Sequence, residues 1–158
     1  ALFRAIPGLA ICHTTGSLDY AEGVARLGGL PEQQRARYRM VERLSSAQMA
    51  QALAAADVAV TRTGATTVAE LEALNVPAVL VPYPFATGAH QRKNADTLLQ
   101  SGQALLLENR DLNAETLVQH VLGLLRSAGA ERPPRQERGR TAAKRVAALI
   151  RETATEAS

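Results

Sequence analysis

Short apolar runs alternate with segments of helical periodicity along most of the chain. Short apolar runs are typical of buried strands, whereas apolar residues spaced three and four apart indicate amphipathic helices. The pattern predicts strands at 9–12, 38–44, 57–61, 78–81 and 103–107. It predicts helices at 18–27, 46–56, 67–74, 90–100, 114–125 and 136–152, with Ser45 or Ser46 and Asn113 as N-caps. Segments 13–16, 31–37 and 83–89 are expected to be loops.

This alternation predicts an α/β fold, a Rossmann-like and mostly parallel sheet with helices on both faces. Residues 78–81 are apolar at every position, as in a strand covered on both faces. We expect one domain over residues 1–152, followed by a frayed tail at 153–158. In such sheets ligands bind beyond the carboxyl ends of the strands. The loops 13–16, 62–66 and 83–89 leave such ends, and the site is expected there.

Composition adds few constraints. The chain has 158 residues, 46% of them hydrophobic and 21% charged, which is ordinary for a globular domain. No apolar run approaches the roughly 20 residues of a membrane span, and the N-terminus does not resemble a signal peptide. Cys12 is the only cysteine, which excludes an internal disulfide. Its apolar neighbours predict a buried thiol, which fits a reducing, cytosolic setting.

The net charge of +3 comes largely from arginines and lysines between 132 and 151. A solvated terminal helix is the favoured interpretation, and contact with phospholipid, nucleic acid or an acidic partner is the alternative. Because aromatic residues make up only 3% of the chain, binding of nucleic acid is not expected. The three histidines are scattered, so no metal site is predicted.

The turn at 62–67 has the features of an anion site. Gly64 lets an anion approach the backbone, and a helix N-terminus presents free N–H groups with partial positive charge. Thr63, Thr66 and Thr67 add hydroxyl donors. The turn matches neither a Walker A loop nor a GxGxxG fingerprint, so a diphosphate held by backbone amides is the remaining chemistry.

Glu70 admits two interpretations. Thr67-Val68-Ala69-Glu70 fits a capping box, in which the Glu side chain reaches back to the N-cap amide. A carboxylate at this place is equally suited to accept hydrogen bonds from a ribose diol. The residues alone leave both interpretations open.

A second polar group opens the helix predicted at 90–100. His90 and Asn94 are four residues apart and share a helix face, with Gln91 beside them. Such a group either grips a sugar or caps the helix, and the spacing alone favours the cap. His13 stands alone in its predicted loop, where a surface role is favoured.

Taken in order, these residues resemble the C-terminal domain of MurG-like glycosyltransferases of the GT-B fold, which transfer N-acetylglucosamine from UDP-GlcNAc to lipid I in peptidoglycan synthesis. The resemblance covers about 9–125 and includes His13-x-Thr15-Gly16. Its most specific series is Ala56-Asp57-Val58, Arg62-x-Gly64-Ala65-x-Thr67-Val68-x-Glu70, Val76-Pro77-Ala78, Val81-Pro82 and His90-Gln91-x-x-Asn94-Ala95.

The resemblance implies that this domain holds the UDP half of the donor, which is a substrate and not a cofactor. Glu70 would bind the ribose hydroxyls, the 63–67 turn would face the diphosphate, and the backbone near Leu44 and Ser45 would read the uracil edge. His90 and Gln91 would reach the donor's sugar and ribose. The expected donor-binding residues are Thr63, Gly64, Ala65, Thr66, Thr67, Glu70, His90, Gln91 and Asn94, with His13, Thr15, Gly16, Leu44, Ser45 and Arg62 as further candidates.

Two departures from the family qualify this expectation. The family's GGSxGA turn would fall before Ala1, and the N-terminal acceptor domain with its general base is not in the sequence. The 85–89 loop is one residue longer than usual and lacks an acidic residue before His90. We therefore expect the chain to be inactive alone and to need that domain, or a partner chain, to meet its lipid-linked acceptor at the cytoplasmic face of the membrane. A subunit of a split transferase, a non-catalytic UDP-sugar module and a scaffold without ligand are the alternatives.

Overall fold

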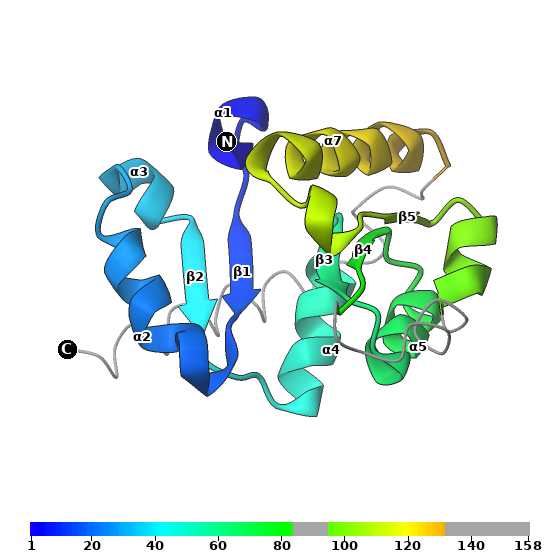
Figure 1. Cartoon of the computed structure of the whole chain (residues 1–158), viewed down its shortest axis with the longest axis horizontal. Coiled ribbons are helices and arrows are strands. Elements are labelled where there is room, and N and C mark those ends of the chain that lie inside the picture. The colour runs from blue at the N-terminus through cyan, green and yellow to red at the C-terminus, as the bar shows by residue number, and fades with distance from the viewer. Residues whose placement is uncertain (84–94, 132–158) are drawn as a thin grey trace. The chain divides into compact units, whose positions relative to one another are not determined.

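The computed structural model describes residues 1–83 and 95–131. These residues belong to two compact units, one containing residues 1–52 and the other residues 53–131. Helix α4, Ser46–Ala55, crosses the boundary between them. Figure 1 labels the elements of both units.

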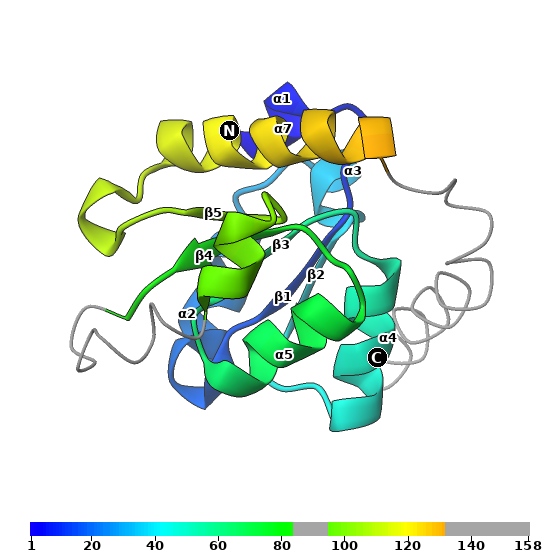
Figure 2. The same ribbon diagram turned by 90° about the vertical axis from the view of Figure 1, so that its right-hand side faces the viewer.

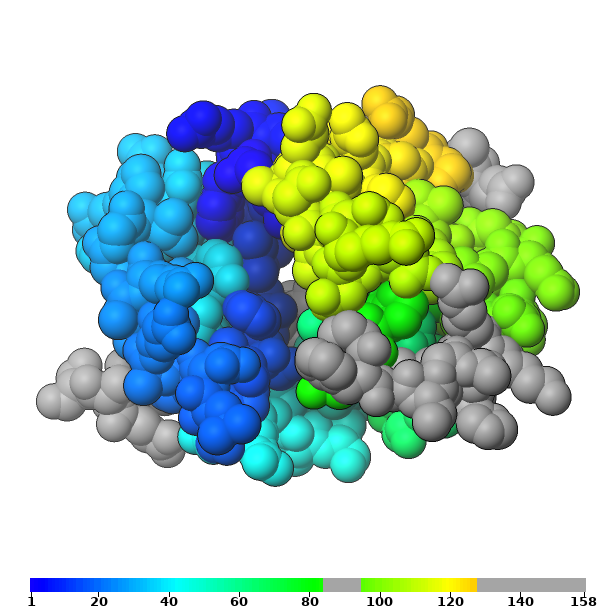
Figure 3. All heavy atoms as spheres, viewed as in Figure 1, coloured from blue at the N-terminus to red at the C-terminus, as the bar shows by residue number. Residues whose placement is uncertain are grey.

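The first unit is a parallel pair of strands with helices beside it. Its elements in order are α1 (Leu2–Ala5), β1 (Ile11–Thr14), α2 (Gly16–Leu27), α3 (Glu32–Arg35) and β2 (Tyr38–Val41). Ile11 lies opposite Tyr38 in the ladder. Helix α2 packs so closely on β2 that a Cβ at Gly23 would lie 2.5 Å from the Met40 sulfur. No residue of α2 is buried, and its side chains lie largely at the surface in the space-filling view (Figure 3).

The second unit holds a three-stranded parallel sheet in the order β3-β4-β5. Its elements are β3 (Ala59–Arg62), α5 (Ala65–Ala73), β4 (Ala78–Val81), β5 (Ala104–Leu106), the 3₁₀ turn η1 (Asn109–Asp111) and α7 (Ala114–Glu131), with residues 95–100 also helical. Helices α5 and α7 lie on opposite faces of this sheet (Figures 1 and 2). The central strand β4 is therefore buried at all four positions.

Most of the buried hydrophobic residues belong to the second unit. Leu71 of α5, Leu80 of β4 and Leu98 are each at most 1% exposed. Burying one such side chain contributes about 1.5–3 kcal/mol of transfer free energy. Among the described residues of the first unit, Met40 is the only buried hydrophobic residue, at 8% exposure.

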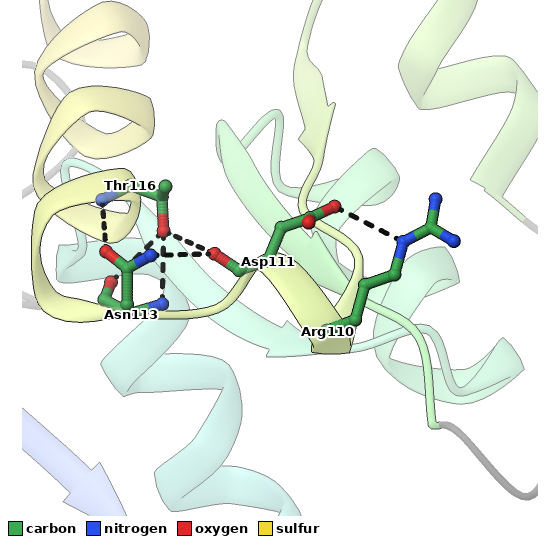
Figure 4. A network of polar contacts seen from close by, with 4 residues as sticks. All are labelled: Arg110, Asp111, Asn113 and Thr116. Atoms are coloured by element: carbon green, nitrogen blue, oxygen red, sulfur yellow. Dashed lines mark hydrogen bonds and ion pairs between the residues drawn. The ribbon is translucent and has the colours of Figure 1, made fainter.

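Side chains cap the N-termini of α4 and α7. Ser45 and Gln48 form a reciprocal pair, since the Ser45 N–H donates to Gln48 Oε1 at 2.8 Å and the Gln48 N–H to Ser45 Oγ at 3.3 Å. Asn113 Oδ1 accepts from the Glu115 N–H at 2.9 Å. It also accepts from the Thr116 N–H at 3.0 Å (Figure 4). Both predicted caps are confirmed, with Ser45 as the cap of α4.

The parallel α/β fold predicted from the sequence is confirmed, and several boundaries are corrected. The strand predicted at 9–12 lies at Ile11–Thr14, so His13 and Thr14 are in β1 and not in a loop. Its residues are mostly exposed, and the pairing with β2 defines the strand more than an apolar run does. The predicted loop 31–37 contains the short helix α3, which follows Pro31 and consists of the helix-forming residues Glu32–Arg35. Cys12 is exposed, so the prediction of a buried thiol is wrong.

Several helices differ from their predicted bounds, among them α2, which begins at Gly16, in the predicted loop 13–16, and not at residue 18. Helix α5 begins at Ala65, two residues before the predicted start, and α7 continues to Glu131, six residues past its predicted end. Asn75, predicted to end the helix before it in a left-handed conformation, has φ 51°. The predicted helix 136–152, the tail 153–158 and the part of the predicted loop from 84 to 89 lie outside the described residues.

Candidate functional site

The turn from β3 to α5 lies at the carboxyl edge of the second unit's sheet. Arg62 ends β3, and the Thr63 side chain that follows is fully buried, at 0% exposure. Gly64 is the N-cap of α5, with an extended backbone (φ −70°, ψ 138°), and its carbonyl accepts the Val68 N–H at 2.9 Å. The first residues of α5, Ala65 and Thr66, are exposed. The exposed residues that begin α5 therefore follow directly after a residue, Thr63, whose side chain is buried in the protein.

The N-terminus of α5 has the features of an anion site. No side-chain hydrogen bond caps it, and its first turn carries no acidic residue. Helices α4 and α7 have their N-caps, and α2 has Asp19 in its first turn. Among the described helices of eight or more residues, α5 is thus the one whose first turn has neither a side-chain cap nor a carboxylate to offset the partial positive charge of its amides.

The space beside Gly64 is open. Its φ of −70° is one that any residue adopts, so the backbone does not require glycine here. A Cβ built at Gly64 would meet no atom within 4 Å. The absence of a side chain at Gly64 therefore leaves room for a ligand to approach the backbone amides. The backbone conformation alone does not explain why this residue is a glycine.

The structure decides against a capping role for Glu70. Gly64 is the N-cap residue, so Thr67 is the third residue of α5 and Glu70 the sixth. The capping box, one of the two interpretations open for Glu70, is therefore wrong. Thr66 and Thr67 precede Glu70 by four and three residues and share its helix face. Because Cα–Cβ bonds in a helix tilt toward the N-terminus, Glu70 lies on a face of α5 that continues into the first turn of the helix.

Arg62 joins three segments at the same edge of the sheet. Its Nη1 donates to the Pro82 carbonyl at 3.1 Å and to Asn109 Oδ1 at 2.8 Å. Its guanidinium carbon lies 5.7 Å from the centroid of the Tyr83 ring. Pro82 and Tyr83 follow β4, and Asn109 begins η1 after β5. Sequence reasoning missed Tyr83 and Asn109, because no local pattern links residues 47 positions apart.

The first unit brings a second set of candidates to the ends of β1 and β2. The His13 ring nitrogen Nδ1 lies 2.8 Å from the Tyr38 hydroxyl, with which it forms a hydrogen bond. The N–H groups of Thr15 and Gly16 donate to the carbonyls of Val41 and Glu42, at 3.2 and 2.9 Å. These amides are therefore used within the fold. Burial raises the pKa of the Tyr38 phenol.

Leu44 and Ser45 lie between β2 and α4. Leu44 is half-buried and Ser45 exposed. The Ser45 N–H already donates to Gln48, and its carbonyl accepts the Met49 N–H at 2.8 Å. Within this stretch the Leu44 backbone is the better candidate for an exchange of hydrogen bonds with a base.

The other predicted residues fall outside what is described. His90, Gln91 and Asn94 are not among the described residues. The group around Gly64 and the group around Gly16 belong to different units. Within residues 1–83 and 95–131 no three His, Cys, Asp or Glu side chains gather as metal ligands, and no helix is long and apolar enough to span a bilayer.

Comparison with known proteins identifies the family. The model of the glycosyltransferase family 28 C-terminal domain matches residues 5–150. A Desulforudis audaxviator protein named UDP-N-acetylglucosamine–N-acetylmuramyl-(pentapeptide) pyrophosphoryl-undecaprenol N-acetylglucosamine transferase is 41% identical over 122 residues, which are 77% of this chain and 33% of that protein. An Anaeromyxobacter dehalogenans protein of the same name is 36% identical over 154 residues, 92% of this chain and 37% of that protein.

A solved structure agrees with these relatives. The crystal structure of Acinetobacter baumannii MurG superimposes with a TM-score of 0.62 at 26% identity, covering 94% of this chain and 46% of that one. The chain spans about a third of the length of the two curated relatives, which is 33% and 37% respectively. The predicted resemblance is confirmed, and the chain belongs to the glycosyltransferase family 28 C-terminal domain family.

Proposed function

We propose that this chain is the donor-binding domain of an inverting glycosyltransferase that transfers N-acetylglucosamine from UDP-GlcNAc to a lipid-linked acceptor. The names of the relatives support both the sugar and the undecaprenyl acceptor. The observation that carries the proposal is the uncapped N-terminus of α5, which has open space at Gly64 and Glu70 on the face of its first two turns.

In this proposal the UDP diphosphate lies against the N–H groups that begin α5. The amides at Ala65 and Thr66 supply donors, and the aligned peptide dipoles add partial positive charge. The Thr66 and Thr67 hydroxyls add donors on the same face. Glu70 accepts hydrogen bonds from the ribose hydroxyls. Its side chain is available for this contact because it does not cap α5. His90, Gln91 and Asn94 remain predicted donor contacts.

The chemistry is a displacement at the anomeric carbon. The acceptor hydroxyl attacks while UDP leaves, through an oxocarbenium-like transition state of the kind found in glycosyl transfer. Negative charge grows on the departing diphosphate, and a fixed helix N-terminus stabilises it without reorganisation. This chain positions the donor, while the acceptor and the general base belong to an additional domain or a partner chain. We therefore place the working enzyme at the cytoplasmic face of the membrane, where it would meet a lipid-linked acceptor of the kind named for its relatives.

The decisive experiment measures UDP binding to the chain and to Glu70→Gln by calorimetry. The substitution removes the charge but keeps the length of the side chain. Loss of charge-assisted hydrogen bonds worth about 1.5–3 kcal/mol weakens UDP binding roughly tenfold to hundredfold. Because Glu70 is not a cap, the melting temperature should stay within a few degrees of wild type. Chemical-shift mapping with UDP should perturb Gly64, Thr66 and Glu70.

The matched control is Glu72→Gln, which makes the same charge change at an exposed position of the same helix. It should leave the affinity for UDP unchanged. With 2′-deoxy-UDP, wild type should bind less well than with UDP, and Glu70→Gln should discriminate much less. Equal losses for Glu70→Gln and Glu72→Gln would indicate a general charge effect and refute a ribose contact. The isolated chain should show no turnover with UDP-GlcNAc and a lipid I analogue.

A further inference from the structure

The contacts of Arg62 form a network that the proposed donor site does not explain. Arg62 is exposed, yet its guanidinium is held from three sides: by the Pro82 carbonyl, by Asn109 and by the Tyr83 ring. Both hydrogen bonds come from Nη1, whose two N–H groups are thereby used. The side chain is therefore fixed in place although it lies at the surface.

The partners of Arg62 come from consecutive crossings of the sheet. Arg62 is the last residue of β3, Pro82 and Tyr83 follow β4 directly, and Asn109 follows β5 by three residues. In parallel order β3-β4-β5 the three carboxyl ends lie at one edge. Arg62, at the start of the turn into α5, thus contacts the segment that follows β4 and the segment that follows β5.

The network contributes little to stability. Exposed hydrogen bonds and ion pairs of long side chains are worth little because water and side-chain entropy compete with them. Among the described residues Arg62 has no acidic partner in an ion pair, so the contacts do not neutralise its charge. Their effect is geometric, because two neutral acceptors and a ring fix where the guanidinium and the attached segments lie.

We propose that Arg62 is a positioning residue of the UDP site, which holds the segments after β4 and β5 in place beside the N-terminus of α5. This inference rests on the proposed function. It assigns Arg62 an indirect role through Asn109 and the Pro82–Tyr83 segment, in place of a direct contact with the diphosphate. It also brings Asn109 and Tyr83 into the group of residues on which UDP affinity depends.

The test compares Arg62→Lys, Asn109→Ala, the double variant and Asn109→Asp by calorimetry with UDP. Lysine keeps the charge but lacks the planar fork that reaches two acceptors and stacks on a ring. We expect Arg62→Lys and Asn109→Ala each to weaken UDP binding about fivefold to tenfold. The double variant should be no weaker than the single ones, because both break one network. Asn109→Asp, which keeps the Oδ1 acceptor but adds a negative charge that repels the diphosphate, should lose less UDP affinity than Asn109→Ala.

The matched control is Arg110→Lys, which changes the neighbouring exposed arginine and should leave UDP affinity unaltered. All melting temperatures should remain within a few degrees of wild type, and Arg62→Lys should shift the Tyr83 amide resonance without ligand. Unchanged affinity in Arg62→Lys and Asn109→Ala, with Glu70→Gln still impaired, would overturn this inference and leave the proposed function standing. Additive losses in the double variant would also overturn it. Absence of UDP binding by wild type would refute the proposed function itself.

Discussion

Two of the strand-to-helix turns in the described part of the chain use similar residues in opposite ways. The turn from β1 to α2 contains Thr15 and Gly16, and the turn from β3 to α5 contains Thr63 and Gly64. Gly16 has a φ of +72°, which the backbone requires, whereas Gly64 has an ordinary φ of −70°. The Gly16 N–H donates to a carbonyl beyond β2, whereas no side chain caps the helix that follows Gly64.

The difference separates a glycine that the backbone conformation requires from one at a position that any residue could occupy. In the first turn the left-handed backbone and the amides are both used to join β1 to β2. In the second turn the buried Thr63 anchors the chain, so the glycine and the following amides are left for another task. The same pair of residue types therefore does not identify a binding site until the backbone conformation is known.

The largest expected effect is the loss of stability caused by a substitution at Gly16. Gly16→Ala forces an alanine into the left-handed region and should lower the free energy of unfolding by about 1–2 kcal/mol. Gly64→Ala should leave stability nearly unchanged, because its φ is ordinary and its Cβ meets no atom. The same Gly64→Ala change should weaken UDP binding by about tenfold, since the methyl group occupies the approach to the amides. Thermal melts measure the stability of both variants, and calorimetry measures their affinity for UDP. A Gly64→Ala variant that is destabilised but binds UDP normally would contradict this expectation.

A smaller effect is expected from the two threonines. The Thr63 side chain is fully buried and has an interaction partner, so Thr63→Val should cost about 0.5–1.5 kcal/mol of stability. Thr15 is half-buried, and its hydroxyl donates only to the neighbouring Gly16 carbonyl at 3.0 Å. Thr15→Val should therefore change stability by less than about 0.5 kcal/mol. Equal costs in urea unfolding would show that Thr63 does not anchor its turn.

The smallest effect concerns Cys12, in the strand that leads into the first turn. Although the residue is exposed, partial desolvation of its thiol raises the pKa, and the Arg39 guanidinium partly offsets that rise. The thiolate fraction at pH 8 is therefore lower than in an unfolded chain, and alkylation by iodoacetamide should be slower than for a cysteine peptide. The stability linked to this group is present below the unfolded pKa of about 8.5 and is lost as pH rises through the folded pKa.

Two changes check the Cys12 expectation. In the urea-unfolded chain, the pH at which the rate of Cys12 alkylation is half-maximal (the midpoint) should fall to the value of the cysteine peptide. Arg39→Leu should move it further up, because the cation that favours the thiolate is gone. A midpoint in the folded chain at or below that of the peptide would contradict a raised pKa of the Cys12 thiol.

Periodicity predicted the elements whose pattern is set by burial or by a local cap. Strand β4 lies at the predicted 78–81 because every one of its positions is apolar and covered. The caps at Ser45 and Asn113 were predictable because a cap needs only a few consecutive residues. Strand β1 was misplaced because its residues are largely exposed and its position depends on pairing with β2, which a local window does not contain.

The sequence by itself determined the residues of the turn, Gly64 to Glu70, and the family they belong to, because both depend on the order of side chains along a short stretch. Tertiary structure alone decided that Gly64 occupies the N-cap position of α5, and this excludes the capping box that left the role of Glu70 open. It also brought Arg62 to Asn109, 47 residues away, because parallel strands place their carboxyl ends at one edge whatever the length of chain between them.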